Sequence, residues 1–116
     1  MNEIKEYTEK IFEVIRHIDE NGYEYWNARE LQNILGYNQW RSINDLIKMA
    51  KVACKESQNN VDDHFALQCK MVDIGSKTTR KVIDYKLSRY ACYLVVMNGN
   101  PKKEIIALGQ TYFVIK

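Results

Sequence analysis

The 116-residue sequence lacks the features that mark several large classes of protein. It contains no repeat, no low-complexity segment and no candidate linker, so we expect a single domain over residues 1–116. No apolar run approaches the roughly 20 residues that a membrane helix needs. The opening residues, MNEIKEYTEK, also lack the apolar core of a secretion signal. We therefore expect a cytoplasmic protein with no membrane partner.

Cysteine and histidine are scarce, which removes most metal and nucleophile chemistry. The three cysteines, Cys54, Cys69 and Cys92, are odd in number and sit in apolar patterns, so we expect reduced, buried thiols. Their spacings are not those of a zinc site. His17 and His64 belong to no recognisable arrangement of nucleophile and base. The sequence therefore predicts no enzyme, catalytic residue, metal or cofactor.

Charge is distributed unevenly along the chain, although the net charge is only +2. Residues 1–30 carry four basic and eight acidic side chains, whereas residues 31–116 carry thirteen basic and seven acidic. A body that is basic outside its first helix is compatible with a polyanionic partner. An ordinary solvated surface is the alternative that charge alone leaves open.

Hydrophobic spacing predicts four elements in the first half of the chain. An amphipathic helix with an acidic outer face is expected over residues 3–20, followed by a short edge strand over residues 23–26. A short helix is expected over residues 27–35 and a longer one over residues 40–54. The longer helix has one apolar face, formed by Trp40, Ile43, Ile47, Ala50 and Cys54.

The second half of the chain predicts a β-hairpin and a pair of helices. Alternating patterns indicate strands over residues 65–74 and 81–87, joined by a polar loop over residues 75–80. Ser88 is a good N-cap, Asn98-Gly99-Asn100 tolerates a left-handed exit, and Pro101 is expected to start the last helix. The fold class is thus a small α+β domain of about five helices with a β-hairpin. The helical pair over residues 87–113 is interpreted as the scaffold.

The two helices around Gly36 have the layout of a helix-turn-helix, in which the second helix enters the major groove. Arginine suits guanine, and asparagine or glutamine suits adenine. The candidate DNA-binding residues on this helix are Gln39, Arg41, Asn44 and Lys48, and Tyr37 in the turn is a candidate for base stacking. Two helices around a glycine turn are also a common packing unit, and that alternative stays open.

The tip of the hairpin supplies a second group of candidates. Lys77, Arg80 and Lys81 lie among the hydroxyl groups of Ser76, Thr78 and Thr79, a composition that binds phosphate oxygens without reading sequence. We therefore expect the hairpin to act as a wing beside the helix pair. The alternative is a solvated turn that lysines keep soluble.

Three blocks of residues resemble the DNA-damage-inducible protein D family and, more distantly, BRO-N domains of phage and viral antirepressor-like proteins. The resemblance covers nearly the whole chain. The first block runs from Trp26 to Leu31 and from Leu35 to Tyr37, with Trp40-Arg41; the second is Asp63-His64-Phe65; the third contains 87–94, Pro101, Lys103-Glu104 and 107–113.

The resemblance implies a bacterial or prophage DNA-binding regulatory domain of the DNA-damage (SOS) response, with DNA of undetermined strandedness as its partner. It also implies a longer protein of which this is the N-terminal part. The alternative is a protein-interaction module that docks on a recombinase or on its own copy. The acidic first helix and the apolar end Tyr112-Phe113-Val114-Ile115 favour that alternative.

Overall fold

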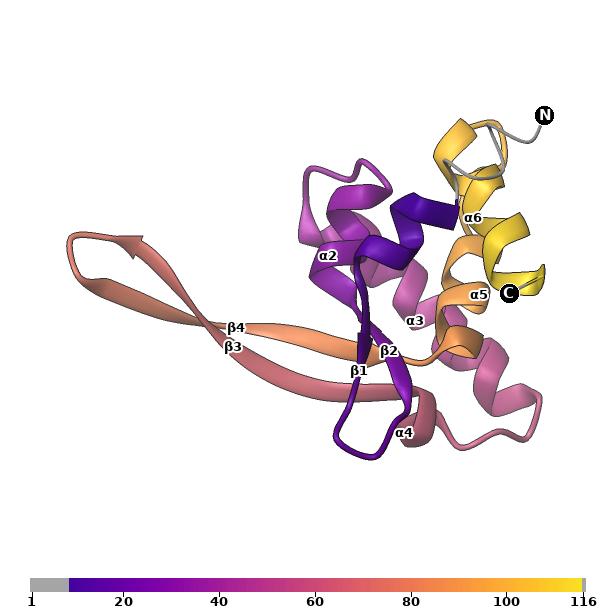
Figure 1. The fold of residues 1–116 in the computed structure, drawn as a ribbon, viewed down its shortest axis with the longest axis horizontal. Coiled ribbons are helices and arrows are strands. Elements are labelled where there is room, and N and C mark those ends of the chain that lie inside the picture. The colour runs from indigo at the N-terminus through magenta and orange to yellow at the C-terminus, as the bar shows by residue number, and fades with distance from the viewer. Residues whose placement is uncertain (1–8, 116) are drawn as a thin grey trace.

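The computed structural model describes residues 9–115, and the side chains of residues 9–114. One long β-hairpin projects from a body of helices and short strands (Figure 1), and the molecule measures 47 × 35 × 31 Å. The predicted α+β class is confirmed. A helical segment at residues 9–14 is followed by β1 (Arg16–Ile18), β2 (Glu24–Asn27), α2 (Ala28–Ile34), α3 (Trp40–Glu56), α4 (Val61–His64), β3 (Phe65–Gly75), β4 (Thr78–Leu87), α5 (Arg89–Met97) and α6 (Glu104–Ile115).

The four strands form one antiparallel sheet in the order β1-β2-β4-β3. Trp26 on β2 is paired with Arg16 on one side and with Leu87 on the other. The prediction of an edge strand over residues 23–26 is therefore wrong, because β2 is an inner strand and β1 and β3 form the two edges. Only the base of β3 and β4 belongs to the body, and the rest of this pair extends outward (Figure 1).

The first helix ends earlier than predicted. It ends at residue 14, and residues 16–18 form β1 instead of continuing the helix to Glu20. Asp19 accepts hydrogen bonds from the backbone N–H groups of Asn21 and Tyr23, both at 2.9 Å, and Gly22 adopts a positive φ of 87°. The Asn21-Gly22 pair therefore closes a β-turn between β1 and β2. The predicted acidic positions Glu3 and Glu6 lie outside the described residues.

The core lies between one side of the sheet and the helices α3, α5 and α6. Trp26, Phe65 and Leu87 supply the sheet side and are almost completely buried. The Trp26 ring also donates a hydrogen bond from Nε1 to the carbonyl oxygen of Phe12 at 3.0 Å. The predicted apolar face of α3 is confirmed for Ile43, Ile47, Ala50 and Cys54, which are buried, whereas Trp40 is half-buried and packs against the core.

The connection between α5 and α6 is longer than the sequence predicted, and it is closely packed. Ser88 caps α5 as expected, accepting from Ala91 N–H at 3.0 Å. The predicted left-handed exit is wrong, since Asn98 is right-handed and a Cβ on Gly99 would meet Ile106 at 2.9 Å. Gly99 is needed for close packing. Pro101 does not start α6 either: Asn100 Oδ1 accepts from Lys102 N–H at 3.0 Å in a turn that delays the helix to Glu104.

Gly109 lies where α6 meets its neighbours. A Cβ at this position would lie 3.2 Å from Phe12 Cζ and 3.2 Å from Val96 Cγ1. The glycine therefore permits the close approach of α5 and the helical segment at residues 9–14. Tyr112 and Phe113, expected to form part of an exposed apolar end, are buried, whereas Val114 is 61% exposed.

The hairpin is longer and its turn shorter than predicted. Thr78, Thr79 and Arg80 belong to β4, so the six-residue loop over residues 75–80 is wrong. Ser76 and Lys77 form the turn with φ of 42° and 64°, both positive as the tightest hairpin turns require. We call β3, this turn and β4 the arm.

Strand alternation gives the arm two different faces. One face carries Leu67, Cys69 and Met71 on β3, opposite Tyr85, Ile83 and Lys81 on β4, and we call it the apolar face. The other carries Gln68, Lys70 and Val72 opposite Asp84, Val82 and Arg80, and we call it the polar face. The alternation that indicated these two strands is confirmed. Cys69 is exposed, however, so the prediction of three buried thiols holds only for Cys54 and Cys92.

Candidate nucleic-acid interface

The four basic residues of α3 lie on one side of the helix. At 100° per residue, Arg41, Lys48, Lys51 and Lys55 fall within a sector about 80° wide, and we call them the basic stripe. Asp45 and Glu56 lie beyond the edge of this sector. Three members of the stripe are exposed, and Lys51 is half-buried. Around the helix, Lys51 lies between the other members of the stripe and the buried face of α3. The stripe therefore begins at the edge of that buried face.

A stack of side chains joins the basic stripe to the arm. The rings of Trp40 and Tyr85 are stacked with centroids 6.4 Å apart, and Lys51 Nζ donates to the Tyr85 hydroxyl at 3.0 Å. The guanidinium of Arg29 covers the other side of Trp40, 4.3 Å from its centroid. Because Tyr85 belongs to the apolar face of the arm, that face and the basic stripe lie on the same side of the molecule.

The structure places the predicted base readers at the start of α3. Gln39 and Arg41 are exposed, and Asn44 is half-buried between Trp40 and Lys48, four residues from each. One face of the Tyr37 ring is covered, because Lys103 Nζ lies 4.0 Å from the ring centroid. Burial also raises the pKa of Tyr37. Tyr37 therefore serves to pack the turn after α2 against the α5–α6 connection.

The three predicted phosphate contacts of the hairpin do not share one face. Lys77 is in the turn, Lys81 lies opposite Met71 on the apolar face, and Arg80 lies opposite Val72 on the polar face. Lys81 thus lies on the same strand face as Tyr85, and Arg80 lies on the opposite face. A wing that uses Lys77, Arg80 and Lys81 together would need both faces of the arm.

Asp84 is a structural residue that the sequence patterns did not reveal. Its side chain is fully buried, and Oδ1 accepts from the backbone N–H groups of Arg29 at 3.0 Å and Tyr85 at 2.8 Å. Oδ2 forms an ion pair with Lys70 Nζ at 2.8 Å. Asp84 therefore caps the N-terminus of α2, where Asn27 makes no side-chain capping bond. Its partner on α2 is 55 residues away in sequence, beyond the reach of a local pattern.

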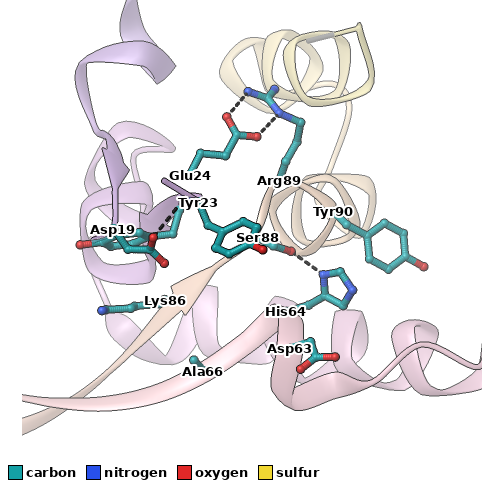
Figure 2. A pocket seen from close by; sticks show the side chains of 11 residues that line it. Asp19, Tyr23, Glu24, Asp63, His64, Ala66, Lys86, Ser88, Arg89 and Tyr90 are labelled. Carbon is teal, nitrogen blue, oxygen red and sulfur yellow. Dashed lines mark hydrogen bonds and ion pairs between the residues drawn. The ribbon is translucent and has the colours of Figure 1, made fainter. Parts of the chain in front are cut away.

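A pocket of about 450 Å³ lies at the end of the sheet near α4 and the start of α5 (Figure 2). His64 Nδ1 and Ser88 Oγ are hydrogen-bonded at 2.7 Å. Ser88 Oγ already accepts the capping bond of α5, and no hydrogen bond joins Asp63 to the imidazole among the described residues. The pair thus lacks the third group that orients a catalytic histidine. These contacts fasten α4 to α5.

A second polar contact at this pocket joins β2 to α5. Arg89 donates to the Glu24 carboxylate from Nε at 2.7 Å and from Nη2 at 3.0 Å (Figure 2). Its guanidinium also covers the Trp26 ring at 5.0 Å from the centroid. The hydrogen bonds from Arg89 hold the pKa of Glu24 below its ordinary value of 4.5. Arg89 therefore has a structural partner, and the pair clamps the sheet to the scaffold helices.

This clamp predicts a difference in the pH dependence of stability. Because the pKa of Glu24 is lowered in the folded state, its ionised form stabilises the fold above pH 4.5, and the effect is lost as pH falls through the folded pKa. We expect Glu24→Gln to lower the free energy of unfolding at pH 7 by about 1 kcal/mol, a value reduced for partial exposure. Urea titrations between pH 7 and pH 3 should converge for the two proteins. The assignment of this effect to Glu24 would be contradicted if the difference in the free energy of unfolding between the two proteins stayed constant with pH. It would also be contradicted if the exposed control Glu20→Gln lost as much stability.

Within residues 9–115, no group of three or more histidine, cysteine, aspartate or glutamate residues could hold a metal ion. No helix in this part of the chain is long and apolar enough to cross a membrane.

The comparisons with known proteins agree with the resemblance seen in the sequence. The chain is 50% identical over 105 residues to the DNA damage-inducible protein D of Escherichia coli strain K12. The aligned region covers 90% of this chain and 38% of that protein, so the chain spans well under half the length of this relative. No solved structure matches the chain significantly. Residues 14–113 match the model of the BRO family, N-terminal domain. The chain therefore belongs to the BRO family.

Proposed function

We propose that this domain binds duplex DNA as a non-catalytic regulatory module in the response to DNA damage. The observation that carries the proposal is the basic stripe of α3 on the same side as the arm. The printed name of the relative, DNA damage-inducible protein D, supports the biological setting. The match to the model of the BRO family, N-terminal domain, supports an N-terminal position of this domain in a longer protein.

The chemistry of α3 suits a DNA groove. Four cations on one side of a 17-residue helix can contact phosphates along its length. Gln39, Arg41 and Asn44 lie at the N-terminal end, where a recognition helix contacts base edges. The exposed helix surface is convex and fits a major groove about 12 Å wide. A single strand would need a groove lined by free aromatic faces, and one face of the Tyr37 ring is already occupied by Lys103.

The proposal predicts a steep dependence of binding on salt. About four phosphate contacts give a slope of roughly −3.6 in log K against log salt, so affinity should fall about a hundredfold between 50 and 200 mM salt. Fluorescence anisotropy with a labelled duplex and a single strand of equal length measures both the salt slope and the preference for duplex over single strand. We expect tighter binding to the duplex at both concentrations.

The absence of binding to either substrate at low salt would overturn the proposal. Equal affinity for the single strand and the duplex would overturn the groove-binding geometry. The recombinase partner expected as an alternative stays a prediction, and a pull-down that survives nuclease treatment would support it.

A further inference from the structure

The apolar face of the arm is unusually exposed for a surface of this size. Leu67 is 64% exposed, Met71 is 62% exposed and Ile83 is 49% exposed, and cross-strand pairing makes them one continuous patch with Cys69. Burying them would be favourable. The core cannot cover them, because only the Phe65–Leu87 end of the arm packs against the helices. A partner must therefore provide the covering surface.

We propose that this partner is the minor groove of the same DNA duplex that α3 binds, an inference that rests on the proposed function. Trp40, Tyr85 and Lys51 join the apolar face to the basic stripe without a break. A polyanion held by the stripe therefore also lies against the arm. Two copies of the chain would bring like charges together, since residues 65–87 carry five basic and two acidic side chains, and one of the acids, Asp84, is already paired with Lys70.

The length of the arm determines which DNA groove it can reach. The arm continues for about 24 Å from Tyr85 to its turn, at roughly 3.4 Å per residue. The major groove, about 12 Å wide, admits either a helix or a two-stranded ribbon. With α3 in that groove, the arm must cross the phosphate backbone, and its outer part reaches the adjacent minor groove. Apolar side chains that enter a minor groove open it and bend the duplex.

The apolar face and the flanking cations then have separate tasks. Met71 and Ile83 contact the sugar walls and base edges, which display few distinguishing groups in a minor groove. Lys81 and Lys77 contact the phosphates that the arm crosses. The arm thus recognises groove width and deformability, and base reading is left to α3.

The experiment compares two double variants on opposite faces of the same strands. Met71→Thr with Ile83→Thr removes apolar contact while keeping side chains suited to a strand. Val72→Thr with Val82→Thr makes the same kind of change on the polar face. Duplex affinity is measured by anisotropy at two salt concentrations, and bending is measured by energy transfer between dyes at the duplex ends. Circular dichroism and urea titration confirm that both variants fold.

We expect the Met71/Ile83 variant to bind an A·T-rich duplex about tenfold more weakly, with reduced bending and an unchanged salt slope. The Val72/Val82 variant should stay within about twofold of the parent. Netropsin, which occupies the minor groove, should weaken DNA binding by the parent protein and leave DNA binding by the Met71/Ile83 variant nearly unchanged.

Equal affinities for the two variants would overturn the role of the arm and leave the proposed function intact. Failure of every form to bind DNA would overturn the proposed function itself. Light scattering tests a third outcome, in which the free protein is a dimer. If Met71→Thr with Ile83→Thr abolishes that dimer, the other variant does not, and DNA affinity is unchanged, the apolar face binds a second copy of the chain.

Discussion

Replacing Asp84 with alanine should lower the free energy of unfolding by about 3 kcal/mol, the largest stability loss we expect from a single charged residue. Its carboxylate is fully buried and accepts from Arg29 N–H and Tyr85 N–H. Alanine leaves both donors without their acceptor and removes the ion pair with Lys70. The side chain also sets the start of α2, so the loss should include fraying of that helix. Equilibrium urea unfolding followed by circular dichroism measures the change.

Two further variants separate the cap from the charge. Asp84→Asn keeps an oxygen for the α2 cap and loses the attraction to Lys70, so we expect about half the loss. Asp73→Ala removes an exposed acid from the same hairpin and should change stability by less than about 0.5 kcal/mol. A loss below about 1 kcal/mol for Asp84→Ala would show that water replaces the carboxylate and that α2 does not depend on this cap.

Local signals predicted those elements whose ends are set by nearby residues. The apolar spacing of α3 and the Ser88 cap of α5 both depend on contacts within a few turns, and both predictions are confirmed. β1 was missed because Arg16–Ile18 continues a helical spacing. Its strand conformation depends on pairing with β2, which follows after a glycine turn. A helix and a hairpin compete for the same residues there, and the strand is favoured by pairing with β2, which carries the buried Trp26.

The candidate site was predictable in its composition and not in its geometry. Arg41, Lys48 and Lys55 recur every seven residues, a spacing that places them on one side of any helix. Which side faces the arm depends on Trp40 and Tyr85, which are 45 positions apart. The wing prediction treated neighbouring cations as one cluster. Because Arg80 and Lys81 lie in a strand and not in a loop, they point to opposite faces.

Replacing two lysines of the basic stripe should cause the largest loss of DNA binding. Lys48→Gln with Lys55→Gln removes two exposed cations, and glutamine keeps the propensity of α3 for a helix. Each lost phosphate contact lowers the magnitude of the salt slope by about 0.9, so the double variant should lose about 1.8 in slope and about a hundredfold in affinity at 50 mM salt. Anisotropy titrations of the same labelled duplex at several salt concentrations give both quantities.

The control variant has the same net charge as this double variant, but its substitution lies elsewhere on the molecule. Lys10→Glu also lowers the charge by two, on an exposed position of the helical segment at residues 9–14, which packs near Gly109 of α6 and away from the basic stripe. If binding depends on overall charge, the control loses as much affinity as the double variant, and the stripe has no special role. If the stripe contacts phosphate, the control keeps the slope of the parent and loses only a long-range attraction that salt screens. The slope therefore distinguishes a defined interface from a generally basic surface.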